Sequence, residues 1–454
     1  MKKGLFVFIV VLVALVIGWK IPQLPPLKPL IIIAAIMVFL ITLVRTNFGL
    51  VILVFSMLLS PEIQVATLQH VVYRAVVLRI DDLLLFVVFI AWIVKIAVRK
   101  EWGILRQTPL NLPIALYLLV CLLATFRGII SNEVSPTTSF FYFLKYIEYF
   151  MIYFMFTNNI HSRKQVRMFM IPFLITAACV SIYAISEIPT GRRVSAPFEG
   201  VEGECNTLAG YLILVISACL GSFLYSKSSV RRWLWGGMIC LAIVPFVYTL
   251  SRGGYVGLIC AYIALIVLTR KKKALLIWIF CLIMAFFPMI VPRRVIERVN
   301  STFEPAKEVE IFGTTLRLET SAAQRIEVWT WIFEKWKAKP LIGYGVTGVG
   351  FVDNQYARVL GEVGALGFLI FIWLLVSIYR NLFQIFKTTQ GDYYKGLAMG
   401  VLAGFAGICA QAFTGNTFII VRVMEPFWFL IACVMVLPHL PAQETELENL
   451  SPQH

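Results

Sequence analysis

The stretch that decides how this chain is built runs from Ser321 to Gly364. It contains three short segments, AAQRIEVWTW at 322–331, KPLIGYGVTGVG at 339–350 and VDNQYARVLGEVG at 352–364. Charged, amide and glycine residues are concentrated here, whereas the sequence on both sides is strongly apolar. So many polar groups on one connection between apolar segments predict a functional site.

The rest of the chain has the composition of a polytopic membrane protein. Hydrophobic residues make up 60% of its 454 positions and charged residues only 14%, and the mean hydropathy is +0.85. This balance excludes a soluble enzyme. Membrane crossing requires ~20 apolar residues, and fourteen runs are candidates: 4–19, 30–44, 48–60, 82–98, 112–127, 140–157, 167–186, 207–225, 233–250, 253–269, 274–291, 359–379, 394–412 and 418–437.

The distribution of Lys and Arg indicates the orientation of these spans. With both termini in the cytoplasm, the inner connections carry twenty Lys and Arg residues and the short outer connections carry eight, in agreement with the positive-inside rule. We therefore expect an all-α polytopic membrane protein of about 12–14 transmembrane helices with one large extracytoplasmic loop. The expected divisions are an N-terminal transmembrane bundle (1–291), an extracytoplasmic catalytic loop (292–358), C-terminal transmembrane helices (359–437) and a disordered cytoplasmic tail (438–454).

The net charge of +16 and the cysteines limit the possible ligands. The basic residues alternate with apolar spans, which excludes a nucleic-acid-binding protein and points to membrane lipids and anionic lipid-linked ligands. The nine cysteines show no spacing typical of a metal site. Lys145 and Glu148 are costly to place in lipid, and their i, i+3 spacing predicts an internal ion pair.

An amphipathic helix is predicted inside the outer loop. Ser321 and Gln324 have the spacing of a capping box, and apolar residues recur at helical spacing from Ile326 to Trp336. Arg325 then lies in the first turns, where free backbone N–H groups and the helix dipole favour a phosphate. The alternative is that Arg325 only contacts lipid headgroups.

Two further elements are expected on the same side of the membrane. Arg252 occupies a Ser-Arg-Gly-Gly turn between two apolar spans, where the glycines allow a ligand to approach closely. It is either part of an anion site shared with Arg325 or a simple interfacial anchor. Asp353 could act as a general base beside sugar hydroxyls, or it could cap a helix that starts near Asn354.

Taken together, these motifs resemble the O-antigen ligase and polymerase superfamily of membrane glycosyltransferases. The similarity covers roughly residues 190–370 and rests on the order of short motifs. They are Arg193 followed by Asn206, Ser251-Arg252-Gly253, Arg325 to Trp329, Pro340-Leu-Ile-Gly343-Tyr344-Gly345, Asp353-Asn354 and Glu362-Val-Gly364-Ala-Leu-Gly367.

The resemblance implies a glycosyltransferase that polymerises undecaprenyl-pyrophosphate-linked repeat units at the bacterial inner membrane, without a metal, cofactor or nucleotide sugar. A chain-length regulator or flippase of the same pathway is the implied protein partner. The implied catalytic residues are Arg252, Arg325 and Asp353. The implied substrate-binding residues are Arg193, Asn206, Tyr344, Asn354 and Glu362.

Two other functions stay open at this stage. A ligase that transfers finished glycan to a lipid or protein acceptor would use the same motifs, although the ligase branch has His-Asn where this chain has Asp353-Asn354. A transporter or flippase would also explain the many spans and the intramembrane Lys145 and Glu148. Against transport, the sequence shows no obvious inverted repeat with paired broken helices.

Overall fold

The computed structural model describes residues 27–64, 77–99, 106–199, 204–269, 272–290, 293–300, 307–311, 314–318, 320–350 and 352–441. The predicted span at 4–19 and most of the predicted tail lie outside these residues. The chain forms two compact units, residues 1–53 with 83–103, and residues 54–82 with 104–454.

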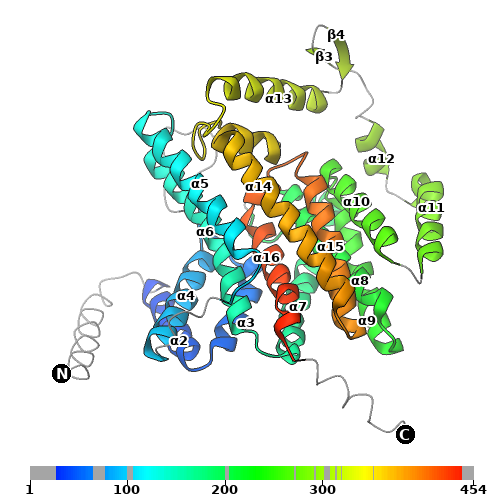
Figure 1. The fold of residues 1–454 in the computed structure, drawn as a ribbon. Helices are drawn as coiled ribbons and strands as arrows, with labels where there is room; N and C mark the ends of the chain where they lie inside the picture. Colours follow the sequence, from blue (N-terminus) through cyan, green and yellow to red (C-terminus); the bar gives the residue numbers. More distant parts are fainter. Residues whose placement is uncertain are drawn as a thin grey trace. The chain divides into compact units, whose positions relative to one another are not determined.

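Every predicted span from residue 30 onward coincides with a helix, which confirms the all-α polytopic class (Figure 1). The helices are α2 (Leu27–Val44), α3 (Thr46–Leu59), α4 (Ile80–Arg99), α5 (Asn111–Ile130), α6 (Pro136–Asn159), α7 (Arg163–Glu187), α8 (Cys205–Tyr225), α9 (Ser229–Tyr248), α10 (Arg252–Leu268), α11 (Lys273–Ile290), α12 (Arg293–Asn300), α13 (Thr320–Ala338), α14 (Gln355–Thr388), α15 (Asp392–Gln411) and α16 (Val421–Met435). Within the described residues, seven helices are long and apolar enough to cross a membrane, and four apolar helices are shorter.

Short elements connect these helices. Two antiparallel strand pairs occur, β1 (Glu62–Gln64) with β2 (Val77–Arg79), and β3 (Lys307–Ile311) with β4 (Thr314–Leu318). Three 3-10 turns complete the described elements: η2 (Ile188–Thr190), η3 (Thr417–Ile419) and η4 (Leu437–His439). The strands are too short to alter the helical class.

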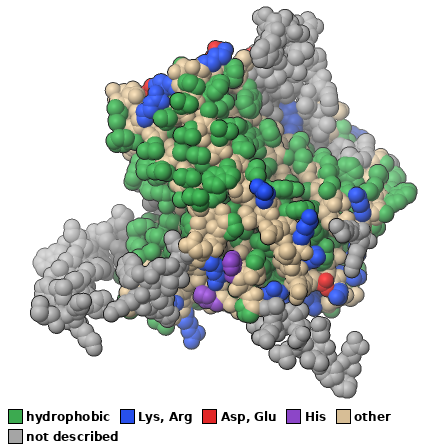
Figure 2. All heavy atoms as spheres, in the orientation of Figure 1, with side chains coloured by type: hydrophobic (Ala, Val, Ile, Leu, Met, Phe, Trp, Pro, Cys, Tyr) green, Lys and Arg blue, Asp and Glu red, His purple; other side chains and the backbone are tan. Residues whose placement is uncertain are grey.

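Hydrophobic side chains cover large parts of the face shown in Figure 2. Large hydrophobic residues such as Trp233 on α9 and Leu369 on α14 are exposed. In water so much exposed apolar surface would be unfavourable, whereas lipid accepts it. The surface therefore agrees with a protein that spans the bilayer.

Close helix packing in the second unit depends on glycines that the sequence analysis did not single out. A Cβ atom on Gly221 of α8 would lie 2.3 Å from the carbonyl oxygen of Gly396, and one on Gly400 of α15 would lie 2.5 Å from that of Ser217. Small residues four positions apart allow helix backbones to approach in membranes. In Figure 1, α15 runs directly beside α8 and α10, and both pairs are in contact.

The amphipathic helix predicted in the outer loop is α13, which begins one residue before Ser321. Its Val328 and Ile332 pack on the segment 349–357. The predicted apolar stripe lies elsewhere on the helix, since Trp329 and Phe333 are exposed. The face of α13 that packs on the protein, with Val328 and Ile332, thus lies next to the apolar stripe predicted from the helical spacing, which includes Trp329 and Phe333.

Connections that are predicted to share a side of the membrane contact each other. On the predicted outer side, Arg127 donates a hydrogen bond to the carbonyl oxygen of Gly343 at 3.1 Å. On the predicted inner side, Arg163 donates to the carbonyl oxygen of Gln390 at 3.0 Å. This grouping agrees with the predicted alternation of spans, and the face that each end occupies stays a prediction.

Candidate functional site

The starts of α8 and α10 are joined by a side-chain hydrogen bond between two of the predicted motifs. Ser251 is the N-cap of α10, where its Oγ accepts from the backbone N–H of Gly254 at 3.0 Å. The same hydroxyl donates to Oδ1 of Asn206 at 2.7 Å. Arg252 follows the cap and is half-buried at the helix N-terminus. The helix terminus carries partial positive charge, and Arg252 adds a cationic residue at the first position of the helix, a combination that favours an anion.

Arg193, in the connection between α7 and α8, binds the backbone of this turn. Its Nε and Nη2 atoms donate to the carbonyl oxygens of Thr249 and Leu250, both at 3.1 Å. The side chain is exposed at the same time. Arg193 is thus bound to the turn that directly precedes Ser251 and Arg252, as expected if Arg193 and Arg252 belong to one site.

The end of α15 connects this turn to α14. Nε2 of Gln411 donates to the carbonyl oxygen of Asn206 at 2.9 Å. Two residues further on, the carbonyl oxygen of Phe413 accepts a hydrogen bond from Nδ2 of Asn354 at 2.7 Å. The predicted motifs at Asn206, Ser251 and Asn354, far apart in the sequence, therefore belong to one network.

Asn354 also caps α14. Its Oδ1 accepts from the backbone N–H of Ala357 at 3.0 Å, and the helix begins at Gln355. The prediction of a helix start at this point is confirmed, but the alternative in which Asp353 supplies the cap is wrong. Asp353 precedes the cap and is exposed. Its role as a base stays a prediction.

The helix α14 is broken at Gly364, which has φ 66° and ψ −171°. The predicted span 359–379 lies within α14 but crosses this break, because the helix starts at 355, breaks at 364 and continues to Thr388. Glycine allows this backbone conformation at little cost. The break separates a short first piece from a long second piece.

The Pro340–Gly345 motif fills the break with backbone hydrogen bonds. Before the break, the N–H of Tyr344 donates to the carbonyl oxygen of Gly361 at 3.1 Å, and that of Gly345 to Glu362 at 2.7 Å. After it, the N–H of Ala365 donates to the carbonyl oxygen of Pro340 at 2.7 Å. Groups freed by the break thus find partners in the motif, as buried backbone requires.

A buried ion pair holds the loop after this motif. Oε1 of Glu362 accepts hydrogen bonds from Nε of Arg358 at 2.9 Å and from the backbone N–H of Thr347 at 2.8 Å. Arg358 and Glu362 are both buried, and the Arg358 guanidinium lies over the ring of Tyr142. Glu362, predicted to bind substrate, makes these contacts within the protein. Arg358 was not predicted, although its i, i+4 spacing to Glu362 is a recognisable signal.

Tyr344 lies between the end of α13 and the break in α14. Its hydroxyl donates to the carbonyl oxygen of Lys335 at 3.1 Å. The ammonium groups of Lys335 and Lys339 lie 5.4 and 4.7 Å from the centre of its ring. This places two cations beside a predicted substrate-binding residue. Arg325 belongs to α13, but its side chain lies outside the described part of the structure.

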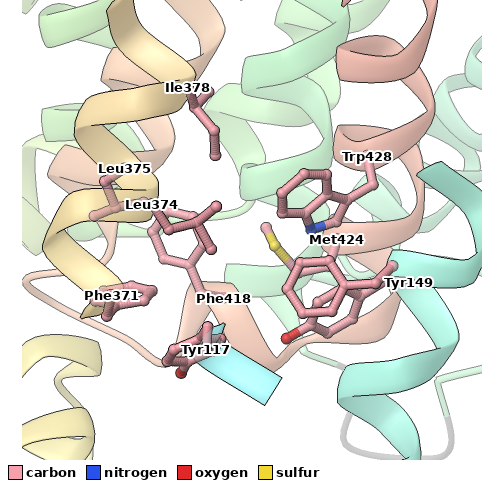
Figure 3. Close-up of a pocket in the computed structure, with 10 residues that line it drawn as sticks. Tyr117, Tyr149, Phe371, Leu374, Leu375, Ile378, Phe418, Met424 and Trp428 are labelled. Carbon is pink, nitrogen blue, oxygen red and sulfur yellow. The ribbon is translucent and has the colours of Figure 1, made fainter. Parts of the chain in front are cut away.

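An apolar pocket is formed by α5, α6, α14, η3 and α16 (Figure 3). Figure 3 shows the ring of Phe371, the aliphatic side chains of Leu374 and Ile378, and the indole of Trp428 around it. These α14 residues follow the break at Gly364. The complete lining comprises Tyr117, Tyr149, Phe150, Phe371, Leu374, Leu375, Ile378, Phe418, Met424 and Trp428.

The fold and this network define a polytopic helical membrane protein with a polar site built around a broken helix. Residues 237–372 match the family model described as O-antigen ligase. The match includes Arg252, Arg325 and the segment 340–367, whereas Arg193 and Asn206 precede it. This part of the chain is therefore similar to O-antigen ligases, as the resemblance of the motifs predicted. No curated protein matches the chain.

Proposed function

We propose that the protein is a membrane glycosyltransferase that polymerises undecaprenyl-pyrophosphate-linked repeat units in surface polysaccharide synthesis. One observation carries the proposal: contacts join Asn206, the Ser251-Arg252 turn and Asn354 at the starts of three helices. The Asn354 helix also contains the break that the Pro340–Gly345 motif fills. Convergence of separate motifs in a chain similar to O-antigen ligases supports a single site for the reaction.

In the proposed reaction, a sugar hydroxyl oxygen of the acceptor attacks the anomeric carbon of the donor glycan. The bond between that carbon and the pyrophosphate oxygen breaks, and the hydroxyl proton leaves. Negative charge develops on the departing pyrophosphate, so fixed positive groups stabilise the transition state. Arg252 and the N-terminus of α10 are suited to this role, with Arg325 and Arg193 as further guanidinium groups.

Acceptor activation is assigned to Asp353. This exposed carboxylate directly precedes the Asn354 cap, so the start of α14 limits its position. A carboxylate within hydrogen-bond reach of the acceptor hydroxyl can take its proton. Tyr344, Asn354 and Glu362 then shape the surrounding site rather than exchange protons.

The proposal places the protein in the bacterial inner membrane with its polar site on the extracytoplasmic face. Membrane lipids would surround it, and a chain-length regulator or flippase of the same pathway is the proposed protein partner.

The alternatives differ in their products. A ligase would transfer finished glycan to a lipid or protein acceptor, and the structure contains the same motifs for both reactions. A transporter or flippase is favoured by one observation, the break in α14, because discontinuous helices often form transport sites. The product, rather than the fold, separates these functions.

The test is the size distribution of lipid-linked and surface glycan in a strain that lacks the gene. Accumulation of single repeat units, reversed by the wild-type gene, is the result expected of a polymerase. Long polymer retained on its carrier would instead identify a ligase. Repeat units confined to the cytoplasmic leaflet would identify a flippase and contradict the proposal.

A further inference from the structure

A second set of buried charges is formed by residues that take no part in the motif network. It comes from the end of β2, the start of α4, and from α6 and α16. The predicted ion pair between Lys145 and Glu148 is confirmed, with Nζ and Oε2 3.1 Å apart. We call the whole set the buried charge cluster, and its members are Arg79, Asp81, Asp82, Lys145, Glu148 and Glu425.

The two cations of the cluster are distributed unequally. Arg79 pairs with Asp81, with Nε donating to Oδ1 at 2.9 Å and a second contact from Nη2 to Oδ2. Lys145 is shared, because its ammonium contacts one oxygen of Asp82 and one of Glu148. These contacts compensate two of the four carboxylates.

Three carboxyl oxygens of the cluster accept no hydrogen bond from the described residues. Among the described residues, Oδ1 of Asp82, Oε1 of Glu148 and Oε1 of Glu425 are buried without a hydrogen-bond partner. Glu425 is fully buried, and its other oxygen is 3.5 Å from Nη2 of Arg79. Arg79 contacts both Asp81 and Glu425 and so brings these two carboxyl groups close to each other.

Charge counting shows why this arrangement needs a ligand. If all four carboxyl groups were ionised, they would exceed Arg79 and Lys145 by two negative charges. Isolated charges in an apolar interior are very unfavourable, so such groups become neutral or bind a counter-ion. Two protons would remove the excess, and each would also supply a donor to an oxygen that lacks one.

We propose that the buried charge cluster is a proton-binding site that holds two protons at neutral pH. One proton is shared between Asp82 and Glu148, as in other carboxyl pairs that cannot both ionise. The second is on Glu425, whose nearest cation is already paired with Asp81. A proton is favoured over a metal ion because no group of three or more His, Cys, Asp or Glu residues in the described structure is arranged to hold one.

Among the described residues, none of the cluster's ion pairs supplies a third cation. Arg422 is on the same helix as Glu425, but its Nη2 donates to the carbonyl oxygens of Ser60 and Phe198. On α6, the residues that follow Lys145 and Glu148 in the sequence are Tyr146 and Tyr149, both buried. Unfolding at neutral pH would release both protons, so the cluster contributes stability that is lost as the pH rises.

Infrared spectroscopy of the full-length protein in lipid nanodiscs tests the proposal directly. Protonated carboxyl groups absorb apart from carboxylates, and at neutral pH the wild type should show a protonated band that exchanges slowly with deuterium. Glu148→Gln and Glu425→Gln should each lower its area by about half, because each removes one of two protons. Glu334→Gln, at an exposed carboxylate, is the matched control and should leave the band unchanged.

Two further measurements, the unfolding temperature of Glu425→Gln and the effect of sodium on the band, separate loss of the proton from misfolding and from metal binding. Glu425→Gln should unfold within a few degrees of the wild type, because it replaces a neutral acid by a neutral amide of the same shape. Absence of a protonated band in the folded wild type, or a band that both variants leave unchanged, would overturn the proposal. Loss of the band when sodium replaces potassium would assign the site to a metal cation and would overturn it as well.

Discussion

At the scale of single residues, the polar groups of the site are held by one another. Ser251, Asn206 and Asn354 each take part in two hydrogen bonds through their side chains or backbone. Glu362 binds both Arg358 and the backbone of Thr347. Such mutual support fixes the geometry of groups that bind substrate and allows little reorganisation during reaction.

Replacement of Arg358 by Ala should therefore destabilise the protein strongly. It leaves Glu362 buried without its cation, and breaking a buried pair in this way costs about 3–5 kcal/mol. The free energy of unfolding in detergent measures the effect. Lys337→Ala, which removes the exposed pair with Glu334, is the control and should cost no more than about 1 kcal/mol. Equal effects of the two substitutions would contradict the role given to Arg358.

At the scale of elements, the break in α14 and the Pro340–Gly345 motif form one unit. The motif supplies backbone partners on both sides of Gly364. A continuous helix would leave the motif without these partners. The two sequence motifs are therefore coupled through the backbone, so a change in either should displace the other.

Gly364→Ala tests this coupling against Gly350→Ala. Both glycines have positive φ, near 66° and 67°, so both substitutions strain the backbone, and the ψ of −171° at Gly364 adds strain because non-glycine residues rarely adopt that region. Only at Gly364 would the new Cβ also meet backbone, 2.4 Å from the carbonyl carbon of Leu341. We expect Gly364→Ala to abolish glycan synthesis and lower the melting temperature, and Gly350→Ala to have a small effect on both. An active, stable Gly364→Ala protein would argue against the coupling.

The close packing of α8 against α15 at Gly221 and Gly400 leads to a second prediction at this scale. Gly400→Val forces the two backbones apart, and overpacking of a tight interface costs about 1–3 kcal/mol or more. Gly237→Val on α9 meets nothing within 4 Å and should be nearly neutral. Thermal unfolding of both variants in the same detergent gives the comparison. A Gly400→Val protein as stable as Gly237→Val would show that the helices do not require close approach.

Elements were more predictable than the contacts between them. Apolar runs of membrane length are visible in a short window of sequence, and so are helix-start signals such as the one at Asn354. Lys145 and Glu148 could be paired because both lie on α6. Their partner Asp82, and Glu425 beside them, come from distant parts of the chain, and only tertiary packing brings them close. The break at Gly364 likewise depends on a separate motif that occupies it.

In the candidate site, too, the local motifs could be predicted and the tertiary contacts between them could not. Most of the site's residues stand in short ordered motifs, so they could be predicted from the sequence, and the match of residues 237–372 to the O-antigen ligase family model agrees with them. Arg358 was missed because it precedes its motif and reaches it only through Glu362. Gln411 was missed because a single amide in an apolar helix carries no pattern of its own.

At the scale of the whole molecule, the predicted orientation can be tested by chemical labelling. A cysteine introduced by Glu334→Cys on α13 should react with a membrane-impermeant thiol reagent in intact spheroplasts. One introduced by Arg231→Cys, at an exposed position on α9, should react only after permeabilisation. Labelling of α13 only after permeabilisation would place the proposed site on the cytoplasmic face and contradict the topology.

The central claim is that the motif network extends lipid-linked glycan. The most direct measurement is chain extension by the purified protein in nanodiscs, supplied with an undecaprenyl-pyrophosphate-linked repeat unit and no metal. The wild type and the control Arg231→Ala should produce a ladder of longer lipid-linked products, and Arg252→Ala should produce none while unfolding at the wild-type temperature. Full-length product from folded Arg252→Ala would contradict the account.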